Sequence, residues 1–249
     1  MPQESLPGIK LKGTVLIRRI MAISMLYGIP GLPNLFAERE EKFLKRIINR
    51  GQVAIDIGAN VGVYTLYLSK LVGKEGHVYA FEPFKPTYKL LSKTIKYNKL
   101  KNVSCYNNAL GEKETQISLE VPKLNNGRID DQFAHIKSAS GGEINMVRLD
   151  RFIQENGISN VSFIKVDVEG YEYFVFEGAR ETIERFRPVI LTEIDTRWTR
   201  RYNTSPQAVE NLLSSFGYKE YVLDKTNLIR SSVSSSKYYN FFFLPYTDQ

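Results

Sequence analysis

Four carboxylates stand where short apolar segments of this sequence come to an end. Asp56 stands in VAIDI, Glu82 follows HVYAF, and Asp167 and Glu169 follow VSFIKV. Carboxylates in such places can accept hydrogen bonds from hydroxyl groups, act as a general base, attract a cationic ligand or bind a divalent metal. The residues around each of them narrow this choice.

A glycine-containing turn at residues 58–62 follows Asp56. A dinucleotide-binding turn needs a second glycine so that backbone amides can approach a pyrophosphate. Asn60 occupies that position here, and the carboxylate of Asp56 would repel phosphate groups. The same carboxylate suits a positively charged nucleoside without phosphates, such as S-adenosylmethionine. We therefore predict that Asp56 faces this cofactor and that Gly58 and Gly62 allow the backbone to approach it closely.

Glu82 ends the next apolar segment, 24 residues after Gly58. An acid at this place can accept hydrogen bonds from both ribose hydroxyls of a nucleoside. Because NAD sites use the same device, Glu82 alone does not distinguish the two cofactors. Its alternative role is a charge at the start of the helix that contains Pro86. Together with Asp56 on the preceding strand end, Glu82 favours a cofactor site.

These acids need a scaffold that brings the ends of several strands together. Short β-branched runs alternate with helical patterns from residue 50 onward, which is typical of βαβ units and a parallel sheet. Open sheets of this kind bind ligands beside the carboxyl ends of their strands, where the four acids lie. The predicted strands are 53–57, 77–82, 103–109, 161–167 and 187–194, and the predicted helices are 61–73, 85–98 and 150–157.

Residues 111–149 interrupt this alternation. Residues 115–121 predict an extra strand, and residues 122–145 predict a long polar loop that contains His135. A loop of this length within a compact domain is either disordered or functional. It could fold over the carboxyl ends of the parallel strands.

The end of the chain has its own pattern. A helix is predicted from Ser205, its cap, to Gly217, and strands at 219–224 and 238–245 predict an antiparallel hairpin. We expect a single domain over residues 1–249, in which residues 50–249 form the core. Residues 1–49 are then a helical cap or extension.

Composition limits the possible functions. With 249 residues, 43% of them hydrophobic, the chain can bury a full core. The net charge is +7, but Lys and Arg form no block of five or more, so a solvated surface is favoured over one that binds nucleic acid or an anionic membrane. A single cysteine, Cys105, excludes an intramolecular disulfide framework and a multi-cysteine zinc site. Two distant histidines, His77 and His135, argue against a histidine-dominated metal site.

Residues 16–36 are apolar but are interrupted by Arg18, Arg19, Pro30 and Pro33. This stretch is too broken to span a bilayer, so no transmembrane segment is predicted. We expect a helix that packs on the domain or covers its cleft. An amphipathic helix lying in a membrane interface is the alternative. A cytoplasmic location is expected.

Several motifs occur together and in order: DIGANVGVYTLYLSK, GHVYAFEPFKPTYKLLSKTIKYN, NNALG, VRLDRFI, IKVDVEGYEYFVFEGA and RPVILTEI. In this combination the chain resembles FkbM-type methyltransferases over about residues 50–195. The resemblance implies a class I methyltransferase fold, which is α/β and Rossmann-like, with a mostly parallel seven-stranded sheet, helices on both faces and a C-terminal antiparallel hairpin. It also implies S-adenosylmethionine-dependent methylation of hydroxyls on sugars or polyketide-like metabolites.

The matching motifs imply a cofactor site. Its residues would be Asp56, Gly58, Asn60 and Gly62 at the methionine end, Glu82 at the ribose, Asn108 and Ala109 beside the adenine, and Asp167 nearby. Many class I methyltransferases have an acid beside the adenine amino group, where this chain has Asn107 and Asn108. We therefore expect an amide or a backbone group to make that contact.

A base would help methyl transfer, because a sugar hydroxyl is a poor nucleophile. Glu169 and Asp167 are the first candidates, since both stand beside the ligand-binding edge, and His135 is the second. A divalent metal held by Asp167, Glu193 and Asp195 is an alternative, but no metal site is predicted.

Two other functions stay open. Nucleic-acid methylation would suit the positive charge, although the fourth strand lacks the Asn/Asp-Pro-Pro-aromatic segment that serves flipped bases. RNA methylation at the ribose 2′-hydroxyl stays open, without an evident Lys-Asp-Lys-Glu arrangement. The chain could also be a noncatalytic cofactor-binding protein. The expected partner is nevertheless a carbohydrate or small molecule with a hydroxyl group rather than nucleic acid.

Overall fold

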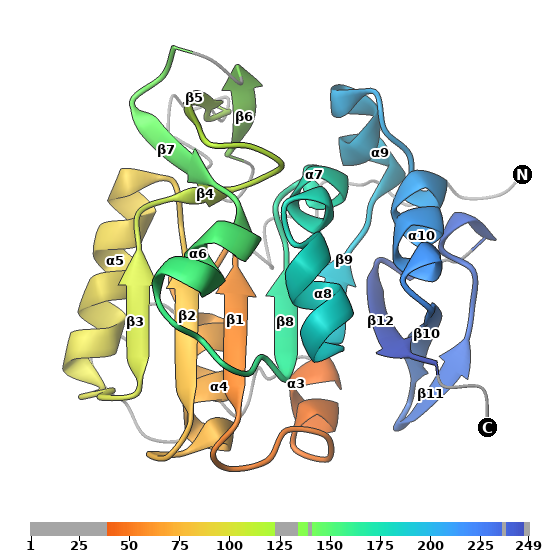
Figure 1. Ribbon diagram of the computed structural model, residues 1–249, viewed down its shortest axis with the longest axis horizontal. Helices are drawn as coiled ribbons and strands as arrows, with labels where there is room; N and C mark the ends of the chain where they lie inside the picture. The colour runs from red at the N-terminus through yellow and green to blue at the C-terminus, as the bar shows by residue number, and fades with distance from the viewer. Residues whose placement is uncertain (1–38, 123–133, 139–140, 236–237, 247–249) are drawn as a thin grey trace, which may run out of the picture.

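An eight-stranded sheet forms the centre of the computed structural model, which describes residues 39–122, 134–138, 141–235 and 238–246 (Figure 1). The strand order is β11-β10-β12-β9-β8-β1-β2-β3. Strands β9 to β3 of this order run parallel, while β12, β10 and β11 are antiparallel to their neighbours. The bounds are β1 (Val53–Ile57), β2 (His77–Phe81), β3 (Val103–Tyr106), β8 (Phe163–Val166), β9 (Val189–Glu193), β10 (Tyr218–Asp224), β11 (Asn227–Arg230) and β12 (Asn240–Pro245).

The five parallel strands confirm the predicted α/β architecture. The two late strands pair antiparallel, as predicted, but they are not consecutive. β11 lies between them in sequence, forms its own hairpin with β10, and adds an eighth strand at the sheet edge. Three of the four β11 residues are exposed, so the segment carries little of the apolar alternation that identifies a half-buried strand.

Helices cover both faces of the sheet (Figure 1). Along β1, Ala54 packs with Leu68 of α4 on one face, and Ile55 packs with Phe152 of α6 and Ile183 of α8 on the other. The helices are α3 (Arg39–Leu44), α4 (Val63–Val72), α5 (Lys85–Tyr97), α6 (Leu149–Glu155), α7 (Glu172–Glu177), α8 (Arg180–Phe186), α9 (Thr196–Thr199) and α10 (Pro206–Ser215), with short 3-10 turns η2 (Arg200–Tyr202) and η3 (Val233–Ser235).

The start of α10 and the N-terminal region are two further parts of the chain for which the sequence made predictions. Ser205 caps α10, as predicted, because its side chain accepts a hydrogen bond from the Ala208 amide. The described part of the N-terminal region contributes buried Leu44 and Ile48 to the face that carries α4. The apolar stretch at residues 16–36 lies outside the described residues.

A second, four-stranded sheet stands above the carboxyl ends of the parallel strands (Figure 1). Its order is β4-β7-β5-β6, with β4 (Ala109–Leu110), β5 (Thr115–Glu120), β6 (His135–Ser138) and β7 (Ile144–Val147). Residues 122–145 are therefore not one polar loop, since β6 and the start of β7 fall within them. These two strands are short and pair on opposite sides of β5, so tertiary pairing rather than local pattern defines them.

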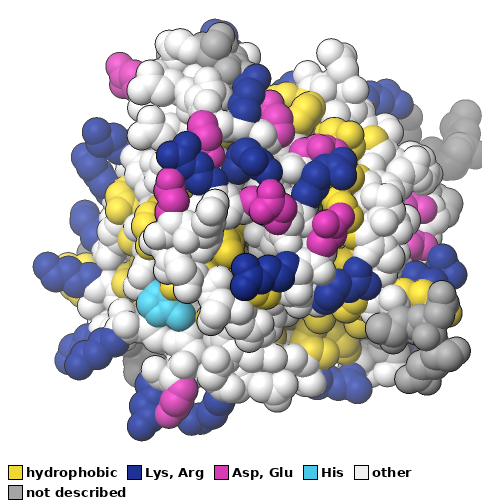
Figure 2. Space-filling view, in the orientation of Figure 1, with side chains coloured by type: hydrophobic (Ala, Val, Ile, Leu, Met, Phe, Trp, Pro, Cys, Tyr) yellow, Lys and Arg dark blue, Asp and Glu magenta, His cyan; other side chains and the backbone are white. Residues whose placement is uncertain are grey.

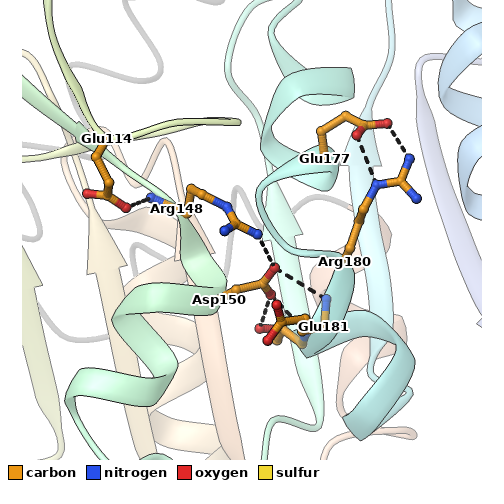
Figure 3. Close-up of polar contacts among 7 residues, drawn as sticks. Glu114, Arg148, Asp150, Glu177, Arg180 and Glu181 are labelled. Atoms are coloured by element: carbon orange, nitrogen blue, oxygen red, sulfur yellow. Dashed lines mark hydrogen bonds and ion pairs between the residues drawn. The ribbon is translucent and has the colours of Figure 1, made fainter.

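The motif VRLD runs from the end of β7 into α6, and its Asp150 side chain links α6 to α8. Asp150 is buried and its Oδ1 accepts hydrogen bonds from the Thr182 amide and hydroxyl, both at 2.8 Å. Its Oδ2 accepts one from the Arg148 guanidinium at 3.0 Å and one from the Glu181 amide at 3.3 Å (Figure 3). Asp150 thus satisfies amides in the first turn of α8 from the start of α6, as a helix cap does.

Candidate functional site

The carboxyl edge of the parallel strands brings three of the predicted acids together. Asp56 of β1 lies opposite Ala80 on the neighbouring strand β2 and opposite Lys165 on the other neighbour, β8. Glu82 follows the last residue of β2, and the Asp167 amide donates a 3.0 Å hydrogen bond to the Ile57 carbonyl at the end of β1. The prediction that these acids share one sheet edge is confirmed.

Left-handed backbone shapes the turn between β1 and α4. Gly58, Asn60 and Gly62 have φ angles of 76°, 50° and 95°. Asn60 tolerates this conformation better than most residues with a side chain, and its Oδ1 accepts a 2.7 Å hydrogen bond from the Val61 amide. The turn is held against β2, because the amides of Gly58 and Ala59 both donate to the Phe81 carbonyl.

Glu82 fixes two backbone segments of the site. Its Oε2 accepts a hydrogen bond from the Asn60 amide and its Oε1 one from the Phe84 amide, each at 2.9 Å. The side chain is buried. The neighbouring Asn107 amide group donates to the carbonyls of Glu82 and Pro83, at 2.9 and 2.8 Å. The carboxylate is therefore held in place before any ligand arrives.

The structure gives both glycines of the turn a packing role that the sequence did not reveal. A Cβ on Gly58 would lie 1.9 Å from the Asp167 carbonyl oxygen, and a Cβ on Gly62 would lie 2.8 Å from Leu91 Cδ1. Gly58 therefore lets the turn approach β8, and Gly62 lets α4 approach α5. Close approach to a cofactor, which we predicted as their role, is additional to these contacts.

Asp56 is a fully buried carboxylate with one unused oxygen. Its Oδ2 accepts a 2.5 Å hydrogen bond from the Thr65 hydroxyl of α4, whereas its Oδ1 has no hydrogen-bond partner among the described residues. Burial raises the pKa of Asp56, and the positive charge of Lys165 opposes this rise. Lys165 Nζ itself lies 3.1 Å from Asp167 Oδ2. A buried acceptor without a donor is costly, so a donor or cation from a ligand would stabilise it.

The loop after β8 carries the two candidate bases in an unusual backbone conformation. Glu169 has a φ of 52° and Gly170 one of 104°. Glu172, the first residue of α7, holds this loop: its Oε1 accepts hydrogen bonds from the Val168 amide at 3.3 Å and the Gly170 amide at 3.1 Å. Glu172 thereby fixes the backbone on either side of Glu169.

Glu172 is the residue of this site that sequence reasoning missed. Its side chain is buried, and its Oε2 has no hydrogen-bond partner among the described residues. The signal was present, because an acid two residues after a glycine can accept amides of the preceding turn. Burial raises the pKa of Glu172 to about 7.

Replacing Glu172 by Gln is expected to remove a pH dependence of stability. Because the pKa of Glu172 is raised from 4.5 to about 7, the folded state keeps a proton that the unfolded state releases. Stability from this group is therefore complete below about pH 4.5 and is lost as the pH rises to about 7. Between pH 5 and pH 8 the loss should be about 2 to 3 kcal/mol.

Urea unfolding of the wild type and Glu172→Gln at both pH values measures this difference. The exposed Glu155 of α6 provides the matched control, Glu155→Gln. An equal loss of stability between pH 5 and pH 8 in the wild type and Glu172→Gln would contradict the assignment.

Three other predicted residues lie in or beside the second sheet. Ala109 is buried at the start of β4, and the Asn108 side chain donates a 3.5 Å hydrogen bond to the Asn145 carbonyl of β7. His135 lies in β6, paired with Glu120 of β5, and not in a loop as we predicted. All three belong to the layer above the carboxyl edge, and their contact with a ligand stays a prediction.

The described residues contain no group of three or more His, Cys, Asp or Glu side chains arranged to hold a metal ion. Asp195, one of the residues considered for a metal, is buried and binds the guanidinium of Arg197 through both carboxylate oxygens. Its acceptor capacity is thus already used. In the same described part of the chain, no helix is long and apolar enough to cross a membrane.

The sequence matches the model of the FkbM methyltransferase domain over residues 56–220, about two thirds of its length. The chain belongs to the FkbM methyltransferase family. This family assignment confirms the resemblance that the motifs of the turn, F-E-P and K-V-D-V-E-G indicated. The matched segment runs from Asp56 through α10, so it includes all the acids of the carboxyl edge.

Individual relatives are distant members of the same fold class. Methyltransferase 1 of Beauveria bassiana is 24% identical over 142 residues, which make up 50% of this chain and 57% of that protein. A protein from Clostridium thermocellum that is provisionally assigned as an rRNA methylase superposes with a TM-score of 0.50 at 13% identity, over 82% of this chain and 91% of the other. A methyltransferase FkbM from Methylobacillus flagellatus gives a TM-score of 0.49 at 16% identity, over 93% and 60%. The superposition on the Clostridium protein agrees with a class I methyltransferase fold.

Proposed function

We propose that this protein is an S-adenosylmethionine-dependent O-methyltransferase that acts on a hydroxyl of a carbohydrate or a related small metabolite. The observation that carries the proposal is a pair of buried carboxylate oxygens, Asp56 Oδ1 and Glu172 Oε2, for which the described part of the chain offers no hydrogen-bond partner. The charge of Asp167 raises the pKa of both groups further, after burial itself. Such an edge is repulsive to phosphate and favourable to a cation.

The residues of the edge fit S-adenosylmethionine. Glu82 accepts one backbone amide at each carboxylate oxygen, so the carboxylate is fixed at the place where an acid can accept hydrogen bonds from the ribose hydroxyls. Asp56 would face the positively charged end of the cofactor, and Asn108 and Ala109 would border the adenine. When bound, the cofactor supplies the methyl group on a positively charged sulfur.

The loop after β8 is the proposed position of the acceptor hydroxyl. Asp167 and Glu169 can accept its proton, and the hydrogen bonds from the loop to Glu172 keep that part of the backbone in place. Orientation of the two reactants accounts for about 7–11 kcal/mol of barrier reduction in well-aligned systems. A proposed base adds to this by making the hydroxyl a better nucleophile.

RNA methylation is the second candidate. It is motivated by the net charge of +7 and by the fold shared with the Clostridium protein. Against it, Lys and Arg on the face shown in Figure 2 are mixed with Asp and Glu and form no continuous basic band there. Phosphate backbones are usually bound by concentrated positive charge.

The test combines cofactor binding with acceptor choice. Calorimetry of the full chain with S-adenosylmethionine measures binding, and labelled cofactor is then incubated separately with a glycan and sugar mixture and with total RNA, with and without EDTA. We expect binding and label in the sugar fraction, unchanged by EDTA. Label in RNA alone would establish the second candidate, and binding without transfer would favour a noncatalytic protein.

A further inference from the structure

A basic and aromatic segment lies directly against the loop that carries the candidate bases. Residues 197–202 read R-W-T-R-R-Y and form most of α9 and all of η2. Gly170 makes the contact, since a Cβ on it would lie 2.5 Å from the backbone carbonyl carbon and oxygen of Trp198. In Figure 1, α9 stands at the carboxyl edge, on the opposite side from the second sheet.

Trp198 is flanked by two guanidinium groups. Its ring centroid lies 5.5 Å from the Arg197 guanidinium carbon and 5.0 Å from that of Arg201. The ring is half-buried, so part of it stays accessible. The accessible part of this indole, beside the proposed position of the acceptor hydroxyl, offers an apolar surface against which a sugar ring can pack.

The three arginines of this segment differ in what they bind. Arg197 is neutralised by the buried Asp195. Arg200 and Arg201 are exposed, and neither forms an ion pair with any residue that the structure describes. Their charges are therefore available, and a guanidinium binds carboxylate, phosphate or sulfate through two parallel hydrogen bonds.

The segment is anchored, so its side chains keep a defined relation to the bases. Asp195 caps α9 by accepting a 2.8 Å hydrogen bond from the Arg197 amide. Tyr202 packs its ring edge against Tyr171, with centroids 4.9 Å apart, and Tyr171 belongs to the turn that begins α7. The bases and the arginines lie on different segments of the chain, and these contacts hold the two segments side by side in the structure.

We propose that Trp198, Arg200 and Arg201 form an acceptor subsite and that the acceptor is a carbohydrate with an anionic group. This inference rests on the proposed carbohydrate O-methylation. The sugar ring would pack against Trp198. The anionic group of the sugar would bind Arg200 and Arg201, away from the acids that would repel it. Its hydroxyl would then face Asp167 and Glu169. Because the arginines attract the anionic group and the acids repel it, the acceptor would bind in a single orientation.

Direct binding tests the subsite without depending on methyl transfer. The full chain, saturated with S-adenosylhomocysteine, is titrated with glucuronic acid, glucose 6-phosphate, glucose 6-sulfate and neutral methyl glucoside. We expect at least one anionic sugar to bind about 10-fold or more tightly than the neutral one, and to lose that advantage in Arg200→Gln/Arg201→Gln. Arg151→Gln, on the exposed side of α6, is the matched control. Which sugar binds identifies the anionic group.

Failure of this subsite is distinguishable from failure of the proposed function. Methylation of neutral sugars with equal KM in the wild type and the double variant would overturn the subsite and leave O-methylation intact. The subsite is also overturned if no anionic sugar binds, or if total RNA binds and is labelled in place of sugars. Anionic-sugar binding that depends on both arginines, without methyl transfer, would support the subsite and contradict the proposed activity.

Discussion

The Gly58→Ala variant is expected to lose cofactor binding together with a large part of its stability. The new Cβ would lie 1.9 Å from the backbone oxygen of Asp167, which no side-chain rotation can relieve. The residue would also keep a φ near 76°, which disfavours alanine. Because the β1–α4 turn and the loop after β8 must separate, we expect a loss of about 3 kcal/mol or more in the free energy of unfolding.

The same displacement should weaken binding of S-adenosylmethionine and lower kcat by about 10²-fold, since misplacement of reacting groups by about 1 Å can slow a reaction by this factor. Calorimetry measures the affinity and urea unfolding measures the stability. Binding is compared at a temperature where circular dichroism shows both proteins folded, so that unfolding is not mistaken for lost affinity.

Gly51→Ala provides a matched control for the backbone conformation. Gly51 has a φ of 84°, close to that of Gly58, but a Cβ on it would have no atom within 4 Å. Its substitution should cost about 1 kcal/mol of conformational strain and leave the cofactor affinity unchanged. Equal effects of the two substitutions would show that the contact with Asp167 has no importance of its own.

The parallel half of the fold was predictable because its signals are local. The apolar run of β1 ends in Asp56 and a turn that needs glycine, and the next run ends in Glu82, so the sequence itself brought the two acids to one edge. The K-V-D-V-E-G motif located the end of β8, the third strand end that carries an acid. Each of these predictions depends on residues adjacent in the chain.

What the sequence did not predict depends on contacts between distant residues. β6 exists through its pairing with β5, so His135 is a strand residue although its neighbours read as a polar loop. Gly58 was assigned to cofactor approach because the Asp167 carbonyl that faces it is more than a hundred residues away. Glu172 was not singled out from the sequence, because the hydrogen bonds that it accepts from the preceding loop depend on how that loop folds.

The carboxyl edge combines fixed and unsatisfied groups in a way that suits a reaction site. Glu82 and Asn107 are held by backbone hydrogen bonds, whereas Asp56 and Glu172 each have one buried oxygen that no described residue binds. A stable fold gains nothing from such oxygens, since each costs the desolvation of a polar atom. Their presence at one edge is therefore better explained by a ligand than by folding.

The largest expected effect on turnover is that of the bases, because a positioned proton acceptor contributes about 10²–10⁴-fold to a rate. Glu169→Gln should lower kcat by this factor while the affinity for S-adenosylmethionine changes little. The substitution preserves shape and removes the charge that accepts the proton. The hydrogen bonds that the Val168 and Gly170 amides donate to Glu172 remain in this variant.

Asp167→Asn is the companion variant and separates two explanations. Asp167 binds Lys165 at 3.1 Å, so its loss changes the charge beside Asp56 as well as any proton transfer. If Asp167 acts mainly through this ion pair, Asp167→Asn should weaken cofactor binding and lower kcat less than Glu169→Gln does. If Asp167 is the base, the order of the two kcat losses is reversed.

The rate as a function of pH identifies the base directly. A carboxylate base makes kcat fall at acidic pH, where it becomes protonated, and the variant that lacks this base should lose that fall along with most of its activity. Glu155→Gln, on the exposed surface of α6, should behave as the wild type. Near wild-type kcat in both Glu169→Gln and Asp167→Asn would mean that neither acid accepts the proton, and His135 of β6 would then be the residue to replace.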